Sequence, residues 1–223
     1  MENKQVKSKK RVTDHGEVFT AQREVNAMLD LVKHETERID SRFLEPACGT
    51  GNFLVEILKR KLTIVENRYV KNQLDYERYA IIALTSVYGV DILQDNVQTC
   101  RDRLLEIFTN FYLNNYKNEA KPEFLKVATF VLSRNILWGD ALSLKTPDQK
   151  AEPIIFSEWS PVNGSMIKRR DFMLAFLLSA DKKEGLQMAM FSDQNDAAYI
   201  PEPIKEFPLT HFLKLGDDTT DEL

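Results

Sequence analysis

Residues 44–53 read Leu-Glu-Pro-Ala-Cys-Gly-Thr-Gly-Asn-Phe, and the prediction of the fold begins with these residues. The residues that lead into it, 42–45, are typical of a short strand, and the residues after it are apolar at every third or fourth position. Gly49 and Gly51 allow positive φ angles and a close approach of the backbone to a ligand. The stretch therefore predicts a strand, a glycine loop and a helix whose free N–H groups can bind a negative group. A tight turn between strand and helix, without a ligand, is the alternative.

Two later segments repeat the order of strand and helix. Residues 87–92 form a short β-like run, and residues 95–112 carry an apolar stripe at helical spacing. Residues 124–132 are predicted as another helix, and residues 135–140 as a short strand that closes on Gly-Asp. Alternating strands and helices predict an α/β fold, with a mostly parallel sheet and helices on both faces. Ligands of such sheets bind at the carboxyl ends of the strands.

Asp91 and Asp140 lie at the ends of the second and third predicted strands. A carboxylate in the first position can accept both hydroxyl groups of a ribose, and one in the second position, or its neighbouring backbone, can bind the amine of adenine. The alternatives are a helix cap for Asp91 and a turn or cap for Asp140. The glycine loop and the two acids occur in order along one predicted sheet. We therefore interpret them together as a ligand site rather than as three unrelated turns and caps.

The segments around this unit are less regular. Thr20 is placed as the N-cap of a helix whose apolar residues recur at helical spacing: Val25, Met28, Leu29, Leu31 and Val32. Residues 60–85 are expected to be a helical insertion in the first crossover. Residues 1–13 are expected to be a flexible basic arm, residues 14–150 the ligand-binding domain, and residues 151–223 an extension packed on the same domain.

Composition limits the class of protein. With 223 residues, of which 43% are hydrophobic, the chain suits one substantial domain with an appendage. Cys48 and Cys100 are too few for a disulfide framework, and the three histidines have no ligand-spaced companions, so we expect a cytoplasmic protein without a metal site. No apolar run reaches the about 18 residues that cross a bilayer, so we expect no membrane segment. The net charge of −4 argues against a surface that coats nucleic acid.

Residues 44–53 closely resemble the S-adenosylmethionine-binding motif of DNA adenine-N6 methyltransferases, especially the modification subunits of restriction systems. The resemblance covers residues 14–145 and implies a Rossmann-like class I methyltransferase fold, in a restriction-modification or mobile-element context. In that family a segment like residues 16–20 closes over the methionine end of the cofactor, the acid at Asp91 binds ribose, and the position of Asp140 contacts adenine. The resemblance implies the following cofactor-binding residues: Phe19, Thr20, Glu45, Pro46, Ala47, Cys48, Gly49, Gly51, Asn52, Phe53, Asp91, Ile92, Asp140 and Ala141.

The resemblance fails where catalysis begins. Family members carry Asn or Asp, Pro, Pro, and then Tyr or Phe, which accept hydrogen bonds from the target amine and stack on a flipped base. No such tetrapeptide occurs in this sequence. The segment in its place offers, as a degenerate remnant, Trp159, Ser160 and Pro161. Two hypotheses follow: a methyltransferase in which these residues or another chain replace the tetrapeptide, or a catalytically inactive scaffold or regulatory subunit.

The same segment has a second interpretation, which we favour. Asn163-Gly164 lies between two β-like runs and predicts a β-hairpin. Three basic residues beyond the turn are expected to be exposed and are the candidates for DNA contact, with a solvated surface as the alternative: Lys168, Arg169 and Arg170. The proline-rich residues after them predict an extended tail. We expect DNA as a partner. Because few residues are left for target recognition, we also expect a specificity subunit or a second methyltransferase subunit.

Overall fold

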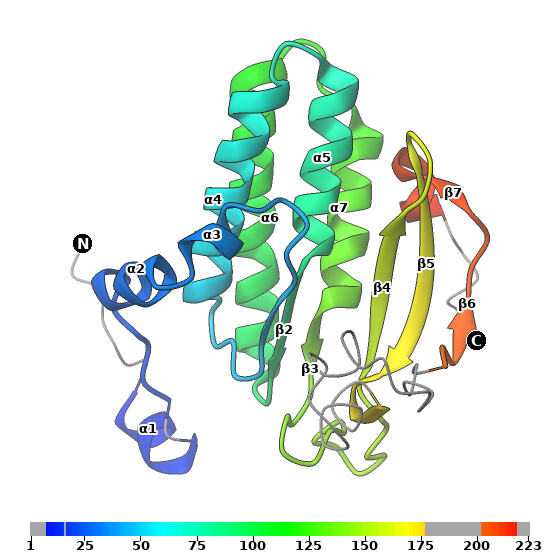
Figure 1. Ribbon diagram of the computed structural model, residues 1–223. Helices are drawn as coiled ribbons and strands as arrows, with labels where there is room; N and C mark the ends of the chain where they lie inside the picture. The colour runs from blue at the N-terminus through cyan, green and yellow to red at the C-terminus, as the bar shows by residue number, and fades with distance from the viewer. Residues whose placement is uncertain (1–7, 16, 177–201, 218–223) are drawn as a thin grey trace, which may run out of the picture.

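The computed structural model describes residues 8–15, 17–176 and 202–217 (Figure 1). The helices of these ranges are α1 (Lys9–His15), α2 (Gln22–Asp30), α3 (Lys33–Thr36), α4 (Asn52–Tyr69), α5 (Gln73–Thr85), α6 (Gln94–Tyr116), α7 (Pro122–Asn135) and the 3-10 helix η1 (Phe212–Asp217). The strands are β1 (Phe43–Glu45), β2 (Val87–Asp91), β3 (Ile136–Trp138), β4 (Ile155–Pro161), β5 (Met166–Met173), β6 (Lys205–Glu206) and β7 (Thr210–His211).

Strands β1, β2 and β3 form a parallel sheet at the centre of the part of the chain that was predicted to bind a ligand. β2 lies between β1 and β3, with Leu44 opposite Tyr88 and Val90 opposite Leu137. The predicted α/β order of strands and helices is confirmed, and the strand positions agree with the prediction within about two residues. Because the strands are parallel, their carboxyl ends meet at one edge of the sheet, which is where ligands of such sheets bind.

The two faces of β2 are covered by different kinds of structure. A Cβ atom built on Gly89 would lie 2.9 Å from Leu54 Cδ1, so α4 packs directly on the first face. On the second face Tyr88 donates a hydrogen bond to Ser157 O at 3.1 Å, and its ring meets that of Phe156 edge to face at 5.4 Å. Both partners belong to β4. At Tyr88 the second face is therefore covered by β4 rather than by a helix, contrary to the prediction of helices on both faces.

The four long helices α4, α5, α6 and α7 lie side by side and extend beyond the sheet (Figure 1). Residues 60–85 comprise the end of α4 and all of α5, so the expected insertion is helical, as predicted. Aromatic rings join these helices: Tyr112 and Phe124 have centroids 4.4 Å apart, and Tyr76 packs against Tyr112. Within the described ranges, no helix has the length and apolarity that a bilayer span needs.

The hairpin prediction is confirmed. β4 and β5 pair antiparallel, and Gly164 in the turn between them has a φ of +56°. β6 and β7 add to the other edge of β5, so residues 202–211 are largely extended, as predicted for the tail. η1 then packs against α7, with Phe212 and Leu215 buried. The first part of the tail, 177–201, lies outside the described residues.

The N-terminal segments differ in part from the expectation. Residues 9–13, expected in a flexible basic arm, belong to α1, and Arg11 forms ion pairs with Asp95 and Glu17. Residues 1–7 lie outside the described residues. The N-cap of α2 is Ala21 rather than Thr20, and this helix ends at Asp30. Leu31, which was expected on the apolar stripe of this helix, is its C-cap and is 82% exposed.

Lys61 of α4 is fully buried and fastens the segment before β1 to the residue before β2. Its Nζ donates hydrogen bonds to Ser86 Oγ at 2.6 Å, to Ile39 O at 3.2 Å and to Ser41 O. Burial lowers the pKa of this amine from 10.5 to about 7.

We expect the free energy of unfolding to rise with pH between about 7 and 10.5 because of Lys61. In this window the unfolded chain binds a proton at Lys61 that the folded chain has lost, and one such group contributes at most about 1.4 kcal/mol per pH unit. Urea unfolding across the window measures the slope. Lys61→Met should remove this part of the slope, and an identical pH profile for the variant and the native chain would contradict the expectation.

Candidate functional site

The glycine loop joins β1 to α4. It is held to β2 by a hydrogen bond from Cys48 N to Val90 O at 2.9 Å, and it closes through Gly51 N to Cys48 O at 2.8 Å. Gly49 and Gly51 have φ angles of +52° and +86°. A Cβ atom on Gly51 would lie 2.6 Å from Cys100 Sγ on α6. A glycine is therefore required at position 51 for two reasons: the φ angle is positive, and the thiol of Cys100 leaves no room for a Cβ atom.

Asp91 fastens the end of β2 to the glycine loop. Its Oδ2 accepts a hydrogen bond from Gly49 N at 2.8 Å, and its Oδ1 accepts from Leu93 N at 2.9 Å and from Asn96 Nδ2 at 3.3 Å. The N-cap of α6 is Leu93, so Asp91 is not the cap residue itself, although it accepts an N–H group at the start of that helix. Asp91 is only 7% exposed, and its position is fixed before any ligand binds.

Asp140 follows β3 and shapes the loop after it. Its Oδ1 accepts a hydrogen bond from Leu142 N at 2.9 Å. Hydrogen bonds from Leu142 N–H and from Ser143 hold the pKa of this carboxyl below its usual range, so it is ionised at neutral pH. The turn that was the alternative interpretation is thus present, and the same side chain also lines the cavity described below.

The N-terminal segment 17–20 forms one wall of the site. At one end Glu17 Oε1 accepts a hydrogen bond from Asn96 Nδ2 at 2.7 Å. At the other end Asn52 Nδ2 donates to Thr20 O at 2.9 Å. This wall is therefore tied to the first turns of both α6 and α4. Gly16 lies outside the described residues.

Arg103 of α6 holds the glycine loop and this wall together. Its Nη1 donates to Thr50 O at 2.6 Å and to Asn52 Oδ1 at 2.8 Å. Because the amide oxygen of Asn52 accepts from Arg103, the amide nitrogen is left to donate to Thr20 O. Sequence reasoning missed Arg103, since nothing in its local pattern distinguishes it from the other polar residues of α6.

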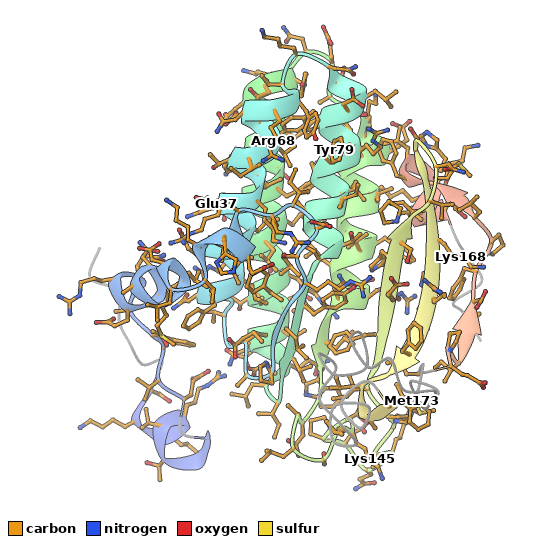
Figure 2. The ribbon with its side chains drawn as sticks, viewed as in Figure 1. Glu37, Arg68, Tyr79, Lys145, Lys168 and Met173 are labelled. Atoms are coloured by element: carbon orange, nitrogen blue, oxygen red, sulfur yellow. The ribbon has the colours of Figure 1, made fainter. Side chains whose placement is uncertain are left out.

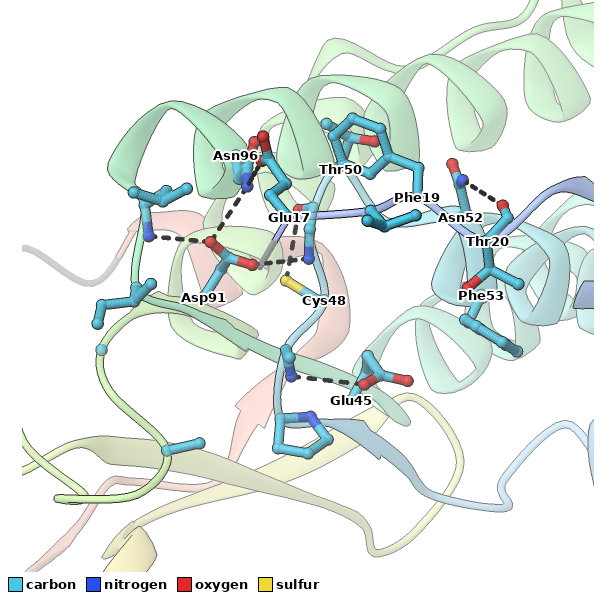
Figure 3. Close-up of a pocket in the computed structure, with 18 of the residues that line it drawn as sticks. Glu17, Phe19, Thr20, Glu45, Cys48, Thr50, Asn52, Phe53, Asp91 and Asn96 are labelled. Carbon is cyan, nitrogen blue, oxygen red and sulfur yellow. Dashed lines mark hydrogen bonds between the residues drawn. The ribbon is translucent and has the colours of Figure 1, made fainter. Parts of the chain in front are cut away.

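These elements enclose a cavity of about 610 Å³ at the carboxyl ends of β1, β2 and β3 (Figure 3). Small-molecule sites have volumes of about 300–1,000 Å³. The cavity is lined by every predicted cofactor residue except Gly51, that is by Phe19, Thr20, Glu45, Pro46, Ala47, Cys48, Gly49, Asn52, Phe53, Asp91, Ile92, Asp140 and Ala141. Five lining residues had not been singled out in the sequence: Thr50, Leu93, Asn96, Gly139 and Leu142. The helix α4 begins beside the cavity with no side-chain cap.

Glu45 has the least compensated carboxylate of the cavity. Its Oε1 accepts one long hydrogen bond, from Ala47 N at 3.4 Å (Figure 3). Burial raises the pKa of this carboxyl above its usual value, and in the described part of the chain no Lys, Arg or His forms an ion pair with it. A cation in the cavity would therefore lower the energy of its ionised form.

The catalytic candidates do not join this site. Trp159 is 4% exposed, and its Nε1 donates to Asn135 Oδ1 at 2.9 Å, as expected for a core residue. Ser160 Oγ donates to Glu158 Oε1 at 2.7 Å. Neither of these residues nor Pro161 lines the cavity.

The basic triplet is not uniformly exposed, contrary to expectation. Arg169 is 3% exposed, paired with Asp171 at 2.9 Å and packed over the ring of Phe207. Its position on β5 turns it inward, because residues of a strand alternate between faces. Its neighbours on either side face the other way and are both paired with acids: Lys168, labelled in Figure 2, with Glu206, and Arg170 with Glu158. DNA contact by these residues stays a prediction.

A family model described as the DNA-methyltransferase domain of MmeI matches residues 18–150. The matched range includes residues 18–20 of the wall, the glycine loop, Asp91 and Asp140, and it ends before β4. No curated protein and no solved structure matches the chain.

Proposed function

The chain belongs to the family of MmeI DNA-methyltransferase domains, a restriction-modification family, and we propose that it binds S-adenosylmethionine and serves in methylation of adenine N6 in DNA. We further propose that the parallel sheet is the core of a Rossmann-like class I methyltransferase fold. A cytoplasmic location suits the two free cysteines, which a reducing compartment keeps unpaired.

The observation that carries this proposal is the cavity at the strand ends. It gathers the glycine loop, Asp91, Asp140 and the wall 17–20 around a volume suited to one nucleoside-sized ligand. In the proposed arrangement Asp91 accepts the ribose hydroxyls, the residues around Asp140 contact adenine, and the methionine end lies at the glycine loop. The free N–H groups at the start of α4 suit its carboxylate.

The protein's own residues supply orientation and a preformed site. Arg103, Asn52 and Asn96 fix the loop and the wall before the ligand arrives, which lowers the entropic cost of alignment. When bound, S-adenosylmethionine itself supplies an activated methyl group on its sulfonium, so the protein needs no metal for the transfer.

A second candidate function has its own support. The sequence lacks the Asn/Asp-Pro-Pro-Tyr/Phe tetrapeptide. Trp159 is buried in the core and donates a hydrogen bond to Asn135 Oδ1. The chain would then be a cofactor-binding scaffold or regulatory subunit, and a partner subunit would supply the groups that hold the target base.

Two measurements test these functions in sequence. Calorimetric titration of the native chain with S-adenosylmethionine should give one-to-one binding, and no heat from a folded sample would contradict both. A tritiated-methyl transfer assay on mixed-sequence duplex DNA then separates them. Incorporation by the isolated chain supports the enzyme, whereas incorporation only after adding the products of neighbouring genes supports the scaffold.

A further inference from the structure

Arg11 lies on α1, ahead of the residues that the family model matches, yet it contacts two elements that border the cavity. Its Nη1 and Nη2 donate hydrogen bonds to the two carboxylate oxygens of Asp95, at 2.6 and 3.0 Å. Its Nε lies 2.7 Å from Glu17 Oε2, and its Nη2 donates to Glu17 Oε1 at 3.1 Å. One guanidinium group therefore joins α1 to the first turn of α6 and to the wall 17–20.

Glu17 extends this attachment into the cavity. It lines the cavity, and its side chain is only 7% exposed. Besides Arg11, Glu17 Oε1 accepts a hydrogen bond from Asn96 Nδ2, and the same amide group donates to Asp91 Oδ1 at 3.3 Å (Figure 3). Contacts therefore run without a break from α1 to the acid that we propose binds ribose.

Arg11 neutralises a carboxylate that is otherwise costly to bury. In the described part of the chain, no other lysine, arginine or histidine forms an ion pair with Glu17. Two further acids are close, because Asn96 bridges Glu17 and Asp91, and Arg11 bridges Glu17 and Asp95. Without a cation, an ionised carboxylate in these surroundings would move toward solvent. Because Glu17 belongs to the wall, that movement would displace the wall from the cavity.

The wall also packs on the glycine loop. A Cβ atom built on Gly49 would lie 3.4 Å from Phe19 Cε1, so the ring of Phe19 lies directly over this loop. At the far end of the wall, Thr20 O accepts the hydrogen bond from Asn52. The position of Phe19 between these two attachments therefore depends on both of them.

We propose that Arg11 is a positioning residue of the cofactor site: it holds the wall 17–20 in the geometry that binds S-adenosylmethionine, and α1 is thereby part of this site. The inference rests on the proposed cofactor function. A wall that is in place before the ligand arrives lowers the entropic cost of binding. Since Arg11 precedes the matched residues, the family match does not cover this attachment.

Calorimetric titration of the full chain with S-adenosylmethionine tests the role of Arg11. Arg11→Gln removes the cation and should weaken binding by at least about tenfold, the effect of losing one charge-assisted contact. Arg23→Gln is the matched control, because Arg23 lies on α2 with 92% of its side chain exposed, and it should leave the affinity unchanged. Glu17→Gln should weaken binding by less than about threefold, since the remaining oxygen can still accept from Asn96.

The double variant Arg11→Gln with Glu17→Gln separates positioning through Glu17 from a general loss of structure. Once the buried charge is absent, the affinity should return to within about threefold of the native value.

A second measurement needs no ligand. Glutamyl endopeptidase cleaves after Glu17 only when the wall opens, so Arg11→Gln should raise the rate of this cleavage by at least about tenfold. Cleavage after Glu37, whose side chain is 44% exposed, should keep its native rate and serves as the internal control.

The outcomes separate the two proposals. Unchanged affinity in Arg11→Gln, or unchanged cleavage after Glu17, overturns the inference and leaves the proposed cofactor function intact. An equal loss of affinity in Arg11→Gln and in the double variant overturns the role of Glu17 in this attachment. If the folded native chain does not bind S-adenosylmethionine, the proposed function fails and this inference fails with it.

Discussion

Gly51→Ala should destabilise the protein by about 3 kcal/mol or more and abolish cofactor binding. The new methyl group would lie 2.6 Å from Cys100 Sγ, and Cys100 is fully buried, so the thiol has little room to move aside. The φ of +86° adds strain for any residue with a Cβ atom. Because Gly51 is also the N-cap of α4, relief of the overlap would displace the start of that helix. Urea unfolding and calorimetric titration measure the two effects.

Gly164→Ala is the matched control for this prediction. Gly164 has a φ of +56°, but a Cβ atom there would meet nothing within 4 Å, so only the backbone strain of about 1 kcal/mol should appear. Combining Gly51→Ala with Cys100→Ala should recover part of the lost stability, because the overlap is removed while the strain persists. Equal costs at Gly51 and Gly164, or no recovery in the double variant, would show that the thiol contact is unimportant.

Asp91→Ala should weaken binding of S-adenosylmethionine by at least about 100-fold, the loss expected when the acceptor of two hydroxyl groups is removed from a buried site. The substitution also leaves Gly49 N and Leu93 N without their acceptor, which should lower the free energy of unfolding by about 2–4 kcal/mol. The glycine loop would then lose the hydrogen bond from Gly49 N to β2, while the one from Cys48 N to Val90 O remains. The affinity and the free energy of unfolding must both be measured, because only the loss of affinity tests the role of Asp91 in ribose binding.

The control for Asp91→Ala lies on α6. Asp102 is an exposed acid that accepts a hydrogen bond from Gln98 Nε2 at 2.8 Å, and it does not line the cavity. Asp102→Asn should change neither stability nor binding appreciably. Unchanged affinity after Asp91→Ala in a folded sample would falsify the cofactor assignment, whatever the change in stability.

Local sequence signals singled out the main polar features of the cavity lining. The glycine loop, Asp91 and Asp140 were found because each lies beside a strand end, and parallel strands bring their carboxyl ends together at one edge. The turn at Asn163-Gly164 was found for a similar reason, since the geometry of a tight hairpin depends on the two residues inside it.

Long-range partners could not be found in this way. Arg103 lies about 50 residues along the chain from the loop that it holds, and Cys100 is about as far from Gly51. Both contacts form only because α6 packs beside α4. Arg169 looked like part of an exposed basic triplet, yet it is buried against Phe207 and paired with Asp171. Its environment depends on which face of β5 the tail covers.

The order of strands and helices, the glycine loop and the two acids could be predicted from the sequence, because they follow from backbone preferences and hydrophobic spacing within a few residues. Tertiary packing places Trp159 in the core and β4 against Tyr88 on one face of the sheet, and among the described residues it leaves Glu45 without a cationic partner. Burial and charge compensation depend on segments far apart in the chain, so no local pattern specifies them.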